Sequence, residues 1–354
     1  MREDPSPVQY ATGPLTSRVL GPERLEVTRQ VRPTPEPGEV LIAVRRAGVC
    51  GTDVHIIEGS YPLATYPLTL GHELSGTVVE VGEDVENVGV GDRVTADPNV
   101  PCLACEECRR NAFNHCADMR IVGVNADGGF ASYVTVPERA VYPVGDLSFG
   151  AAALVEPLAC ALWGFKRSRF EPGGRAIVFG AGPMGCLLVQ LLRFSGASSV
   201  VAVDLVGHRL EVARSLGATE TVQAEDQGAL ARLLERGFDL VVDATGSPRV
   251  LQDAVAYARP NGVVWAFGVA PPGATVSVSP FELFRKDLTL FGSFALNRTF
   301  DEAIAVASTP GLELEALVSH VVPLAQFESG IHLARHEPRR MKVQFEMVAE
   351  EAAS

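Results

Sequence analysis

Four cysteines lie within fifteen residues of the chain, at Cys102, Cys105, Cys108 and Cys116. Their spacing, C-x2-C-x2-C-x7-C, allows four thiolates from one loop to close a tetrahedral zinc site with no open position, which is typical of a structural metal. A ferredoxin-like iron–sulfur cluster is the competing interpretation, because C-x2-C-x2-C occurs there as well. The neighbouring His115 is expected to be an ordinary loop residue, since four thiolates leave no position for it.

A second set of candidate ligands is spread along the chain, at Cys50, His72 and Glu156. A thiolate, an imidazole and a carboxylate are the ligand types of a catalytic zinc that keeps one position for water or substrate. Each residue also has an ordinary explanation, because a lone cysteine is usually a small buried apolar residue. The metal interpretation therefore requires three distant segments to converge.

The chain also contains a dinucleotide-binding pattern, Gly180-Ala181-Gly182-Pro183-Met184-Gly185, between an expected strand and an expected helix. Gly180 would permit the tight turn, Gly182 the approach of the backbone to a pyrophosphate, and Gly185 close packing of helix on strand. The N-terminus of that helix offers free N–H groups to phosphates. Asp204 follows Gly185 by 19 residues, where an acid can accept hydrogen bonds from the adenosine ribose. Together these features predict a nicotinamide cofactor rather than FAD, which usually has its pattern at the N-terminus of its chain.

The acid at Asp204 also predicts the choice between NAD and NADP. Its carboxylate can accept from both ribose hydroxyls of NAD, whereas the 2′-phosphate of NADP would place negative charge against negative charge. Arg209, five residues later, tempers this preference without reversing it. We expect NAD to be preferred by at least about tenfold in kcat/KM.

The composition limits the partners and the location. The 354 residues include 30 Lys and Arg against 43 Asp and Glu, a formal net charge of −13, which argues against nucleic-acid or anionic-membrane partners. No run approaches the ~20 apolar residues that span a bilayer. The charged start, Met1-Arg2-Glu3-Asp4-Pro5, lacks the apolar core of a secretory signal. Four of the seven cysteines are clustered, which does not suggest a disulfide framework. We therefore expect a cytoplasmic protein of two domains.

Two patterns of secondary structure divide the chain. Up to about residue 150, short strands alternate with Gly and Pro turns, which predicts a barrel-like β body. From about Pro172, strands and helices alternate, which predicts βαβ units in a parallel sheet. The predicted strands of the first part include Glu39–Ala47, Gly76–Val81 and Phe130–Val136. Those of the second are Arg175–Phe179, Val200–Asp204, Asp239–Asp243, Val263–Phe267 and Thr289–Gly292, with helices at Pro183–Ser195 and near Pro248–Ala258.

After residue 293 the chain returns to mixed elements and ends in a predicted strand, Met341–Val348. The predicted fold class is therefore α/β, with a doubly wound domain inserted before the tail of a β-rich domain. The expected boundaries are 1–158 and 294–354 for the β-rich domain and 159–293 for the inserted one.

These motifs together resemble the zinc-containing alcohol dehydrogenases of the medium-chain dehydrogenase/reductase superfamily. Gly71-His72-Glu73-x2-Gly76-x5-Gly82-x2-Val85 matches their zinc signature, and Val49–Ile56 and Val155–Ala159 are most similar to the polyol branch of sorbitol, xylitol and arabitol dehydrogenases. The resemblance implies a GroES-like catalytic domain, a Rossmann NAD-binding domain, and one catalytic and one structural Zn²⁺ per chain. It also implies a homo-oligomer, a tetramer rather than a dimer.

The resemblance assigns roles to the metal-site residues. Cys50 and His72 would be ligands of the catalytic zinc, and Glu156 stands where many alcohol dehydrogenases have a second cysteine. Glu73 would lie beside the metal, either ligating it in some states or holding the bound water. Asp53 would orient His72, or only cap the turn.

Other roles concern the proton and the packing of the core. Thr52 would hydrogen-bond the substrate hydroxyl, and His55 would pass its proton to solvent. Cys160 and Cys186 have no role in the family and are expected to be packing residues. The implied reaction is the NAD-dependent interconversion of a secondary hydroxyl of a polyol and the ketose.

Several alternatives stay open at this point. Threonine dehydrogenases share the Cys50–Asp53 motif and are the closest alternative, together with other secondary alcohol dehydrogenases. Sorbitol dehydrogenases carry an arginine directly after the phenylalanine of Phe294-Ala295-Leu296-Asn297, whereas Arg298 here comes three residues late. This departure leaves arabitol, xylitol and phosphorylated polyols open, because one arginine can bind a phosphate.

Two further alternatives lie outside this group. A non-enzymatic zinc-binding protein on the same fold would be expected to have lost Cys50, His72 or His55. A zinc-free quinone or enoyl reductase would lack both the Gly71-His72-Glu73 motif and the cysteine loop.

Overall fold

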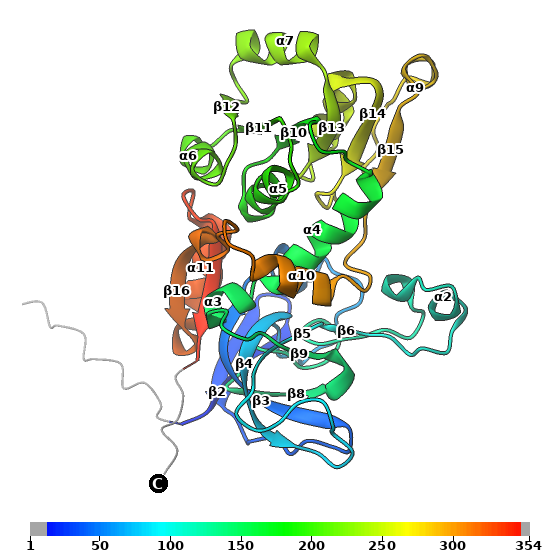
Figure 1. Ribbon diagram of the computed structural model, residues 1–354. Coiled ribbons are helices and arrows are strands. Elements are labelled where there is room, and N and C mark those ends of the chain that lie inside the picture. Colours follow the sequence, from blue (N-terminus) through cyan, green and yellow to red (C-terminus); the bar gives the residue numbers. More distant parts are fainter. Residues whose placement is uncertain (1–12, 348–354) are drawn as a thin grey trace, which may run out of the picture.

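The computed structural model describes residues 13–347 and has the expected α/β architecture of two domains (Figure 1). The strands are β1 Leu15–Gly21, β2 Arg24–Arg29, β3 Glu39–Gly48, β4 Glu73–Val81, β5 Arg93–Ala96, β6 Asn99–Val100, β7 Arg120–Ile121, β8 Tyr133–Pro137, β9 Val141–Pro143, β10 Arg175–Phe179, β11 Ser199–Asp204, β12 Glu220–Gln223, β13 Phe238–Asp243, β14 Ala258–Ala266, β15 Thr289–Gly292, β16 Val318–Pro323 and β17 Lys342–Glu346. The helices are α1 Gly51–Ile57, α2 Glu106–Arg109, α3 Phe149–Ala152, α4 Val155–Ser168, α5 Pro183–Phe194, α6 Gly207–Ser215, α7 Gln227–Arg236, α8 Pro248–Ala254, α9 Pro280–Lys286, α10 Phe300–Ala307 and α11 Phe327–His336.

The second half of the chain builds a six-stranded parallel sheet in the order β12-β11-β10-β13-β14-β15. This is the Rossmann order: successive strands are added on one side of β10 as far as β12, and from β13 onward they are added on its other side. Side chains alternate between the two faces of β10: Ala176 and Val178 join the core under α4 and α5, while Ile177 and Phe179 join the core on the opposite face. Because helices cover both faces, the inner strands β10 and β11 are buried along almost their whole length, as is typical of parallel strands.

The first part of the chain forms a mostly antiparallel sheet in the order β16-β17-β3-β4-β5-β9, with β8 paired to β3. Its last strand in sequence, β17, runs antiparallel to β3, so residues near both ends of the chain lie side by side (Figure 1). The expected β body is therefore completed by the C-terminal segment.

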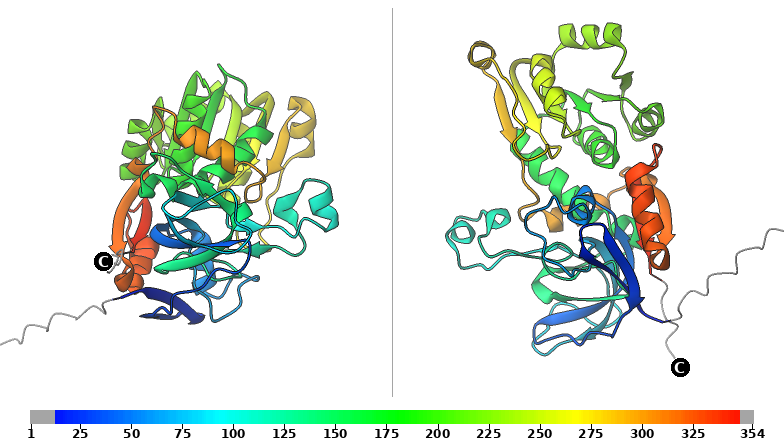
Figure 2. Two further views of the ribbon diagram at one scale, coloured as in Figure 1. Left: turned by 60° about the horizontal axis from the view of Figure 1, so that its bottom comes forward. Right: turned by 180° about the vertical axis from the view of Figure 1, so that it is seen from behind.

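Helix α4 leads from the β-rich body toward the parallel sheet, and α10 packs against it on the return path (Figure 2). The parallel sheet spans residues 175–292, within the segment 159–293 that was expected for the inserted domain. None of the helices in residues 13–347 combines the length and apolar character that crossing a bilayer requires.

Most predicted elements agree with the structure, and the differences have local causes. β8 begins at Tyr133 rather than Phe130, because Phe130 and Ala131 bond to β1 instead: the Ser17 amide donates to the Phe130 carbonyl at 2.9 Å. Helix α1 directly follows Cys50 and was not predicted. The charged start of the chain lies outside the described residues, and so does Val348, the last residue of the predicted C-terminal strand.

Candidate metal and cofactor sites

The four clustered cysteines converge in a lobe that projects from the β-rich domain. Cys105 precedes α2, Cys108 lies inside it, and Leu103 and Asn111 turn the loop with left-handed backbone angles (φ 61° and 60°). The four sulfur atoms all lie within 4.8 Å of one another. The loop therefore brings together its own four candidate ligands without help from distant segments.

The spacing of the sulfurs fits a single ion. Four sulfurs around one zinc at about 2.3 Å would lie about 3.8 Å apart, and Cys105 Sγ is 3.9 Å from Cys116 Sγ. A cluster of several irons and sulfides would hold the cysteines farther apart, so the geometry favours zinc over the iron–sulfur alternative. Backbone N–H groups lower the pKa of Cys105 to about 6, while burial raises the pKa of Cys108 to about 12. Four thiolates need a cation among them.

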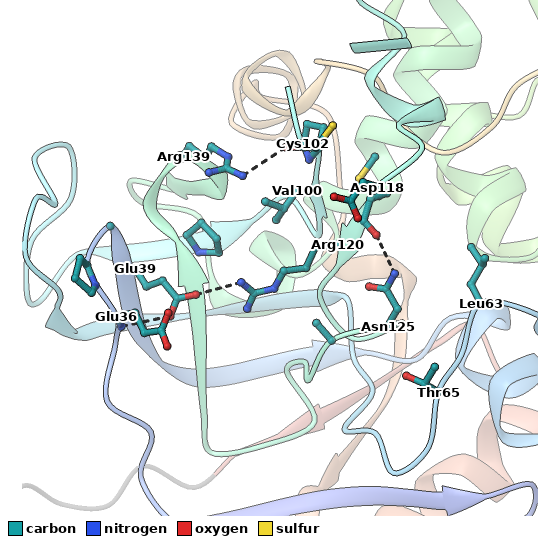
Figure 3. Close-up of a pocket in the computed structure, with 16 residues that line it drawn as sticks. Glu36, Glu39, Leu63, Thr65, Val100, Cys102, Asp118, Arg120, Asn125 and Arg139 are labelled. Atoms are coloured by element: carbon teal, nitrogen blue, oxygen red, sulfur yellow. Dashed lines mark hydrogen bonds and ion pairs between the residues drawn. The ribbon is translucent and has the colours of Figure 1, made fainter. Parts of the chain in front are cut away.

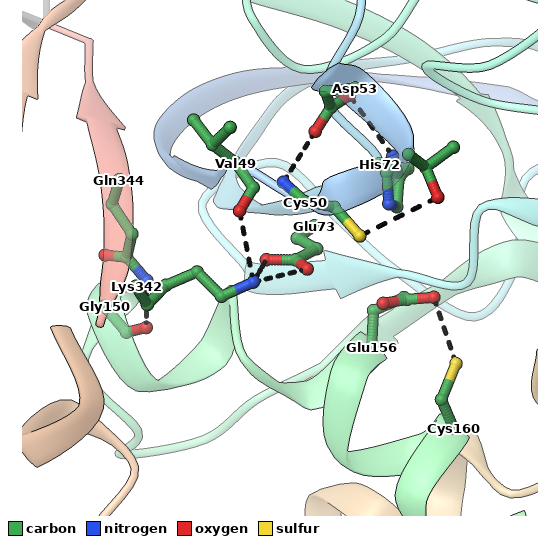
Figure 4. Close-up of polar contacts among 11 residues, drawn as sticks. Val49, Cys50, Asp53, His72, Glu73, Gly150, Glu156, Cys160, Lys342 and Gln344 are labelled. Carbon is green, nitrogen blue, oxygen red and sulfur yellow. Dashed lines mark hydrogen bonds and ion pairs between the residues drawn. The ribbon is translucent and has the colours of Figure 1, made fainter. Parts of the chain in front are cut away.

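A second convergence is buried between the domains and unites Cys50, His72 and Glu73 (Figure 4). Cys50 is the N-cap of α1, and Glu73 opens β4 directly after His72. One ligand atom from each of the three lies within 4.8 Å of the other two. His72 is 6% exposed and Glu73 1%, so this cluster is shielded from water.

Asp53 caps α1 and also lies beside His72, and its role in orienting the imidazole stays a prediction. Its Oδ2 accepts the Cys50 amide at 2.8 Å and so caps α1, while its Oδ1 lies 3.5 Å from His72 Nδ1. Those last two atoms are buried and have no hydrogen-bond partner. Burial lowers the pKa of His72, but Asp53 and Cys50 outweigh it and raise that pKa overall.

Lys342 completes the cluster and was not recognised from the sequence. Its Nζ donates to both carboxylate oxygens of Glu73 at 2.7 Å (Figure 4). Burial lowers the pKa of Lys342, but the neighbouring Glu73 carboxylate raises it, and the pKa is raised overall. A signal was available: the chain has only three lysines, and this one opens a strand whose alternate residues Val343 and Phe345 are apolar.

Glu156 enters the same region from the first turn of α4 and is 9% exposed. Burial raises the pKa of Glu156. Repulsion from the Glu73 carboxylate raises it further, whereas attraction to His72 lowers it. The Cys160 thiol, one helical turn later, donates to Glu156 Oε1 at 3.4 Å. Cys160 is therefore more than the packing residue expected from the sequence, whereas Cys186 does lie in the core.

The candidate proton-relay residues flank the cluster. Thr52 Oγ1 lies 3.9 Å from Cys50 Sγ, whereas His55 is exposed on α1 with its Nδ1 3.6 Å from Glu58 Oε2. Within the described residues no hydrogen bond joins Thr52 to His55, so their relay stays a prediction.

The glycine-rich turn lies between β10 and α5, where a dinucleotide would need it. Gly180 has a φ of +94°, and a Cβ on Gly185 would lie 1.8 Å from the Gly180 carbonyl oxygen. A Cβ on Gly182 would meet nothing within 4 Å, so the backbone there faces open space. Pro183 starts α5, and Met184 packs against the core beneath. The geometry fits all three glycine roles, with the approach to Gly182 left free.

Asp204 ends β11 beside this turn. Its Oδ2 accepts the Ala181 amide at 2.7 Å and its Oδ1 the Val206 amide at 2.8 Å. Arg209 Nη1 lies 4.0 Å from Asp204, and its buried Nε has no hydrogen-bond partner. The carboxylate therefore shapes the glycine turn, and its contact with the ribose stays a prediction.

The cysteine lobe also contacts the segment that follows β15. Asn114 Nδ2 donates to the Phe294 carbonyl at 2.8 Å, and Asn297 Nδ2 to the Asn111 carbonyl at 2.9 Å. Arg298 lies 4.8 Å over the ring of Phe113 and thus faces the lobe. The lobe is therefore attached to the connection between the two domains.

One cavity lies elsewhere, in the β-rich domain (Figure 3). It measures about 800 Å³, and Arg120 and Glu39 form an ion pair of 3.2 Å across it. Cys102 is the one candidate metal ligand among its described lining residues, so this cavity is separate from the Cys50–His72 cluster.

This combination of domains and clusters defines a class of enzyme. Residues 36–146 match the alcohol dehydrogenase GroES-like domain and residues 183–309 the zinc-binding dehydrogenase domain. The chain belongs to this family of zinc-binding dehydrogenases, as the motifs implied.

Individual relatives extend the match over most of the chain. D-altritol 5-dehydrogenase of Agrobacterium fabrum is 37% identical over 87% of this chain and 92% of its own length. D-arabinitol dehydrogenase 1 of Uromyces fabae is 36% identical over 88% of this chain and 90% of its own length.

Solved structures show the same fold with coenzyme bound. An alcohol dehydrogenase of Escherichia coli CFT073 complexed with NADH superimposes with a TM-score of 0.88, at 28% identity over 94% of this chain and 99% of its own. A zinc-binding dehydrogenase of Sinorhizobium meliloti 1021 bound to NADP superimposes with a TM-score of 0.87. It is 29% identical, over 95% of this chain and 100% of its own.

Proposed function

We propose that this protein is a zinc-containing polyol dehydrogenase that uses NAD to interconvert a secondary hydroxyl of a polyol and the ketose. The observation that carries the proposal is the buried convergence of Cys50, His72 and Glu73, with Glu156 in the first turn of α4 entering the same region, together with a glycine turn that is open to a dinucleotide. The polyol substrates named for the two relatives above support the substrate class.

The buried cluster suits a divalent cation. Apart from Lys342, the groups gathered there are acids, a thiol and an imidazole, and the pKa values of His72 and Glu156 are both raised. Burial is the main cause for Glu156, whereas Asp53 and Cys50 raise the pKa of His72, and a dication bound there would stabilise the deprotonated groups. Cys50, His72 and Glu156 would hold the zinc, and Asp53 would fix the ring of His72 through Nδ1.

A zinc ion held there would act as a Lewis acid on the alcohol oxygen. This chain's own residues would do the rest. Thr52 would accept a hydrogen bond from the substrate hydroxyl and, as it takes up that proton, would pass its own hydroxyl proton on toward His55, which is exposed on the same helix and would release a proton to water. The free amides at the start of α5 would bind the coenzyme phosphates. Burial of the cluster keeps water from the reacting carbon.

The coenzyme preference rests on Asp204. The two structural neighbours bind different coenzymes, NADH and NADP, so the choice depends on residues of this chain. The side chain of Asp204 is only 7% exposed and its charge is anchored by two amides. A 2′-phosphate would meet a carboxylate that cannot move away, which supports NAD.

The assembly is proposed as a homo-oligomer, a tetramer rather than a dimer. β15 is the edge of the parallel sheet, so its outer backbone groups are available to another strand. Phe281 and Phe284 of the neighbouring α9 are 64% and 80% exposed. A second copy of the same edge, related by a two-fold axis, would cover both the free edge of β15 and the two exposed phenylalanines. A cytoplasmic location is proposed with it, because all seven cysteines are free.

A substrate panel with metal analysis tests the proposal. C4–C6 polyols and their ketoses, with threonine and a simple secondary alcohol added, are followed through NADH absorbance. We expect a polyol to give the highest kcat/KM and about two zinc ions per chain. Threonine as the best substrate would support the threonine dehydrogenase alternative, and a zinc-free active enzyme would contradict the mechanism.

A further inference from the structure

Helix α11 carries two histidines one turn apart, away from both clusters described above. Among the seven histidines of the chain, His332 and His336 are the only two that stand four residues apart. Residues at this spacing lie on the same face of a helix. Their ring centres are 4.6 Å apart and the ring planes are inclined by 51°, so the rings meet without stacking face to face.

The packing of α11 directs this pair to solvent. The helix lies against β16 and β17 at the edge of the molecule (Figure 1). Its buried residues are Phe327, Gly330 and Ile331, whereas both histidines are exposed. The two imidazoles are therefore accessible to an ion in solution, which the buried cluster at Cys50 is not.

The charges near the pair permit a cation. Arg335 lies between the histidines in sequence, but its guanidinium donates to both carboxylate oxygens of Glu23 at 2.9 and 2.8 Å, which neutralises its charge. Arg339 lies beyond the end of α11 and is exposed, so water and salt screen it. The last turn of a helix carries partial negative charge that attracts cations, and His336 is the last residue of α11.

Two imidazoles four residues apart on one helix form a chelate for a divalent metal ion. Nitrogens bound to one zinc at about 2.0–2.1 Å lie about 3 Å apart, and rings with centres at 4.6 Å reach this by rotating about their side-chain bonds. Within residues 13–347 no metal-capable group of three or more side chains includes either histidine. The other ligands would be water, so the ion would exchange freely.

We propose that His332 and His336 form a third metal site, at the surface, for a divalent transition-metal ion that favours imidazole: Zn²⁺, Ni²⁺ or Cu²⁺. The site goes beyond the proposed function, because it shares no ligand with the buried cluster or the cysteine lobe. The bound ion would link the last two turns of α11. Added zinc would then raise the metal content from two ions per chain to three, and a brief treatment with a weak chelator would return it to two.

The test uses Ni²⁺ and the full-length, zinc-loaded enzyme in equilibrium dialysis. The variants are His332→Gln, His336→Gln and the double variant, all at exposed positions of α11. The matched control is His320→Gln on β16, because His320 has no second histidine four residues away. Zinc is counted in the same samples, so that any exchange of Ni²⁺ at the other two centres is seen as lost zinc.

We expect the unmutated protein and the control to bind one Ni²⁺ per chain. Each single variant should weaken this binding by at least about tenfold, because the remaining imidazole has lost a ligand held at high effective concentration. The double variant should bind little less than either single variant. Ni²⁺ should also slow the reaction of His332 and His336 with diethylpyrocarbonate, as followed by peptide mass spectrometry, and leave that of His320 unchanged.

Equal affinity for Ni²⁺ in all variants would overturn the proposal, because the ion would then bind elsewhere. Single variants that each retain half of the binding would overturn it as well, since the imidazoles would act separately. Loss of zinc from the unmutated protein before Ni²⁺ is added is a different result: it bears on the proposed function and leaves the comparison of the histidine variants valid.

Discussion

The two metal centres of this chain are assembled in opposite ways. The cysteine lobe takes all four sulfurs from residues 102–116, and its short turns alone bring them within 4.8 Å. The buried cluster takes its groups from the start of α1, the start of β4, the first turn of α4 and the last strand, β17. A local centre can be formed by one loop, whereas a convergent centre reports whether the whole β-rich domain has folded.

The largest expected effect falls on the convergent centre. His72→Ala should remove about one zinc per chain and lower kcat/KM to about a thousandth or less, because the charge stabilisation at the substrate oxygen is lost. The cysteine lobe should keep its zinc. Metal analysis and NADH absorbance on the same sample measure both. Two retained zincs with normal turnover would contradict the assignment of His72.

The matching change in the local centre should affect stability instead. Cys105→Ser leaves three thiols that repel one another without a closed metal site, and we expect a loss of about 3 kcal/mol. For domains of this size that lowers Tm by roughly 6–12 °C. Turnover per buried-cluster zinc should change little at low temperature. If turnover falls as far as in His72→Ala, the two centres are not independent.

A third change spares both centres and tests the coenzyme site. Asp204→Ser should reduce the preference for NAD over NADP by about tenfold, because the charge facing the ribose is removed. Zinc content should stay at that of the unmutated enzyme. The ratio of kcat/KM for the two coenzymes measures the effect. Comparable efficiency with both in the unmutated protein would mean that Arg209 governs the pocket.

The smallest expected effect tests the contact between the lobe and the domain connection. Asn114→Ala removes the bond to the Phe294 carbonyl and should cost about 1 kcal/mol, a decrease in Tm of roughly 2–4 °C. Zinc content should not change, since Asn114 is no ligand. Asn297→Ala, which removes the companion bond, is the matched variant. Loss of lobe zinc in either would show that the contact helps to hold the metal.

The sequence predicts local features better than convergent ones. Strand β10 begins and ends where its apolar run does, because burial on both faces leaves an unmistakable pattern. Strand β15 also has its predicted bounds, although it is mostly exposed at the sheet edge. Cys102 to Cys116 were recognisable from spacing alone. The grouping of Cys50, His72 and Glu156 needed the family resemblance, since nothing in their separation along the chain specifies contact.

The contacts that the sequence did not reveal are convergent ones too. The ion pair of Lys342 with Glu73 and the thiol contact of Cys160 with Glu156 both depend on how elements pack. Lys342 is placed by the pairing of β17 with β3, and Cys160 by one turn of α4. Even so, a lysine at the start of a predicted strand is costly to bury without an acid, and this could have prompted a search for its partner.

The separation of Glu73 and Lys342, 269 residues along the chain, has a consequence for synthesis on the ribosome. At roughly 5–20 residues per second, the lysine is made about 13–54 s after the glutamate. The cysteine lobe is complete in sequence at residue 116 and can take up its metal while most of the chain is still unmade. The buried cluster must wait for the final strand. A growing chain therefore passes through a period in which it holds one metal centre, and the second becomes possible only as translation ends.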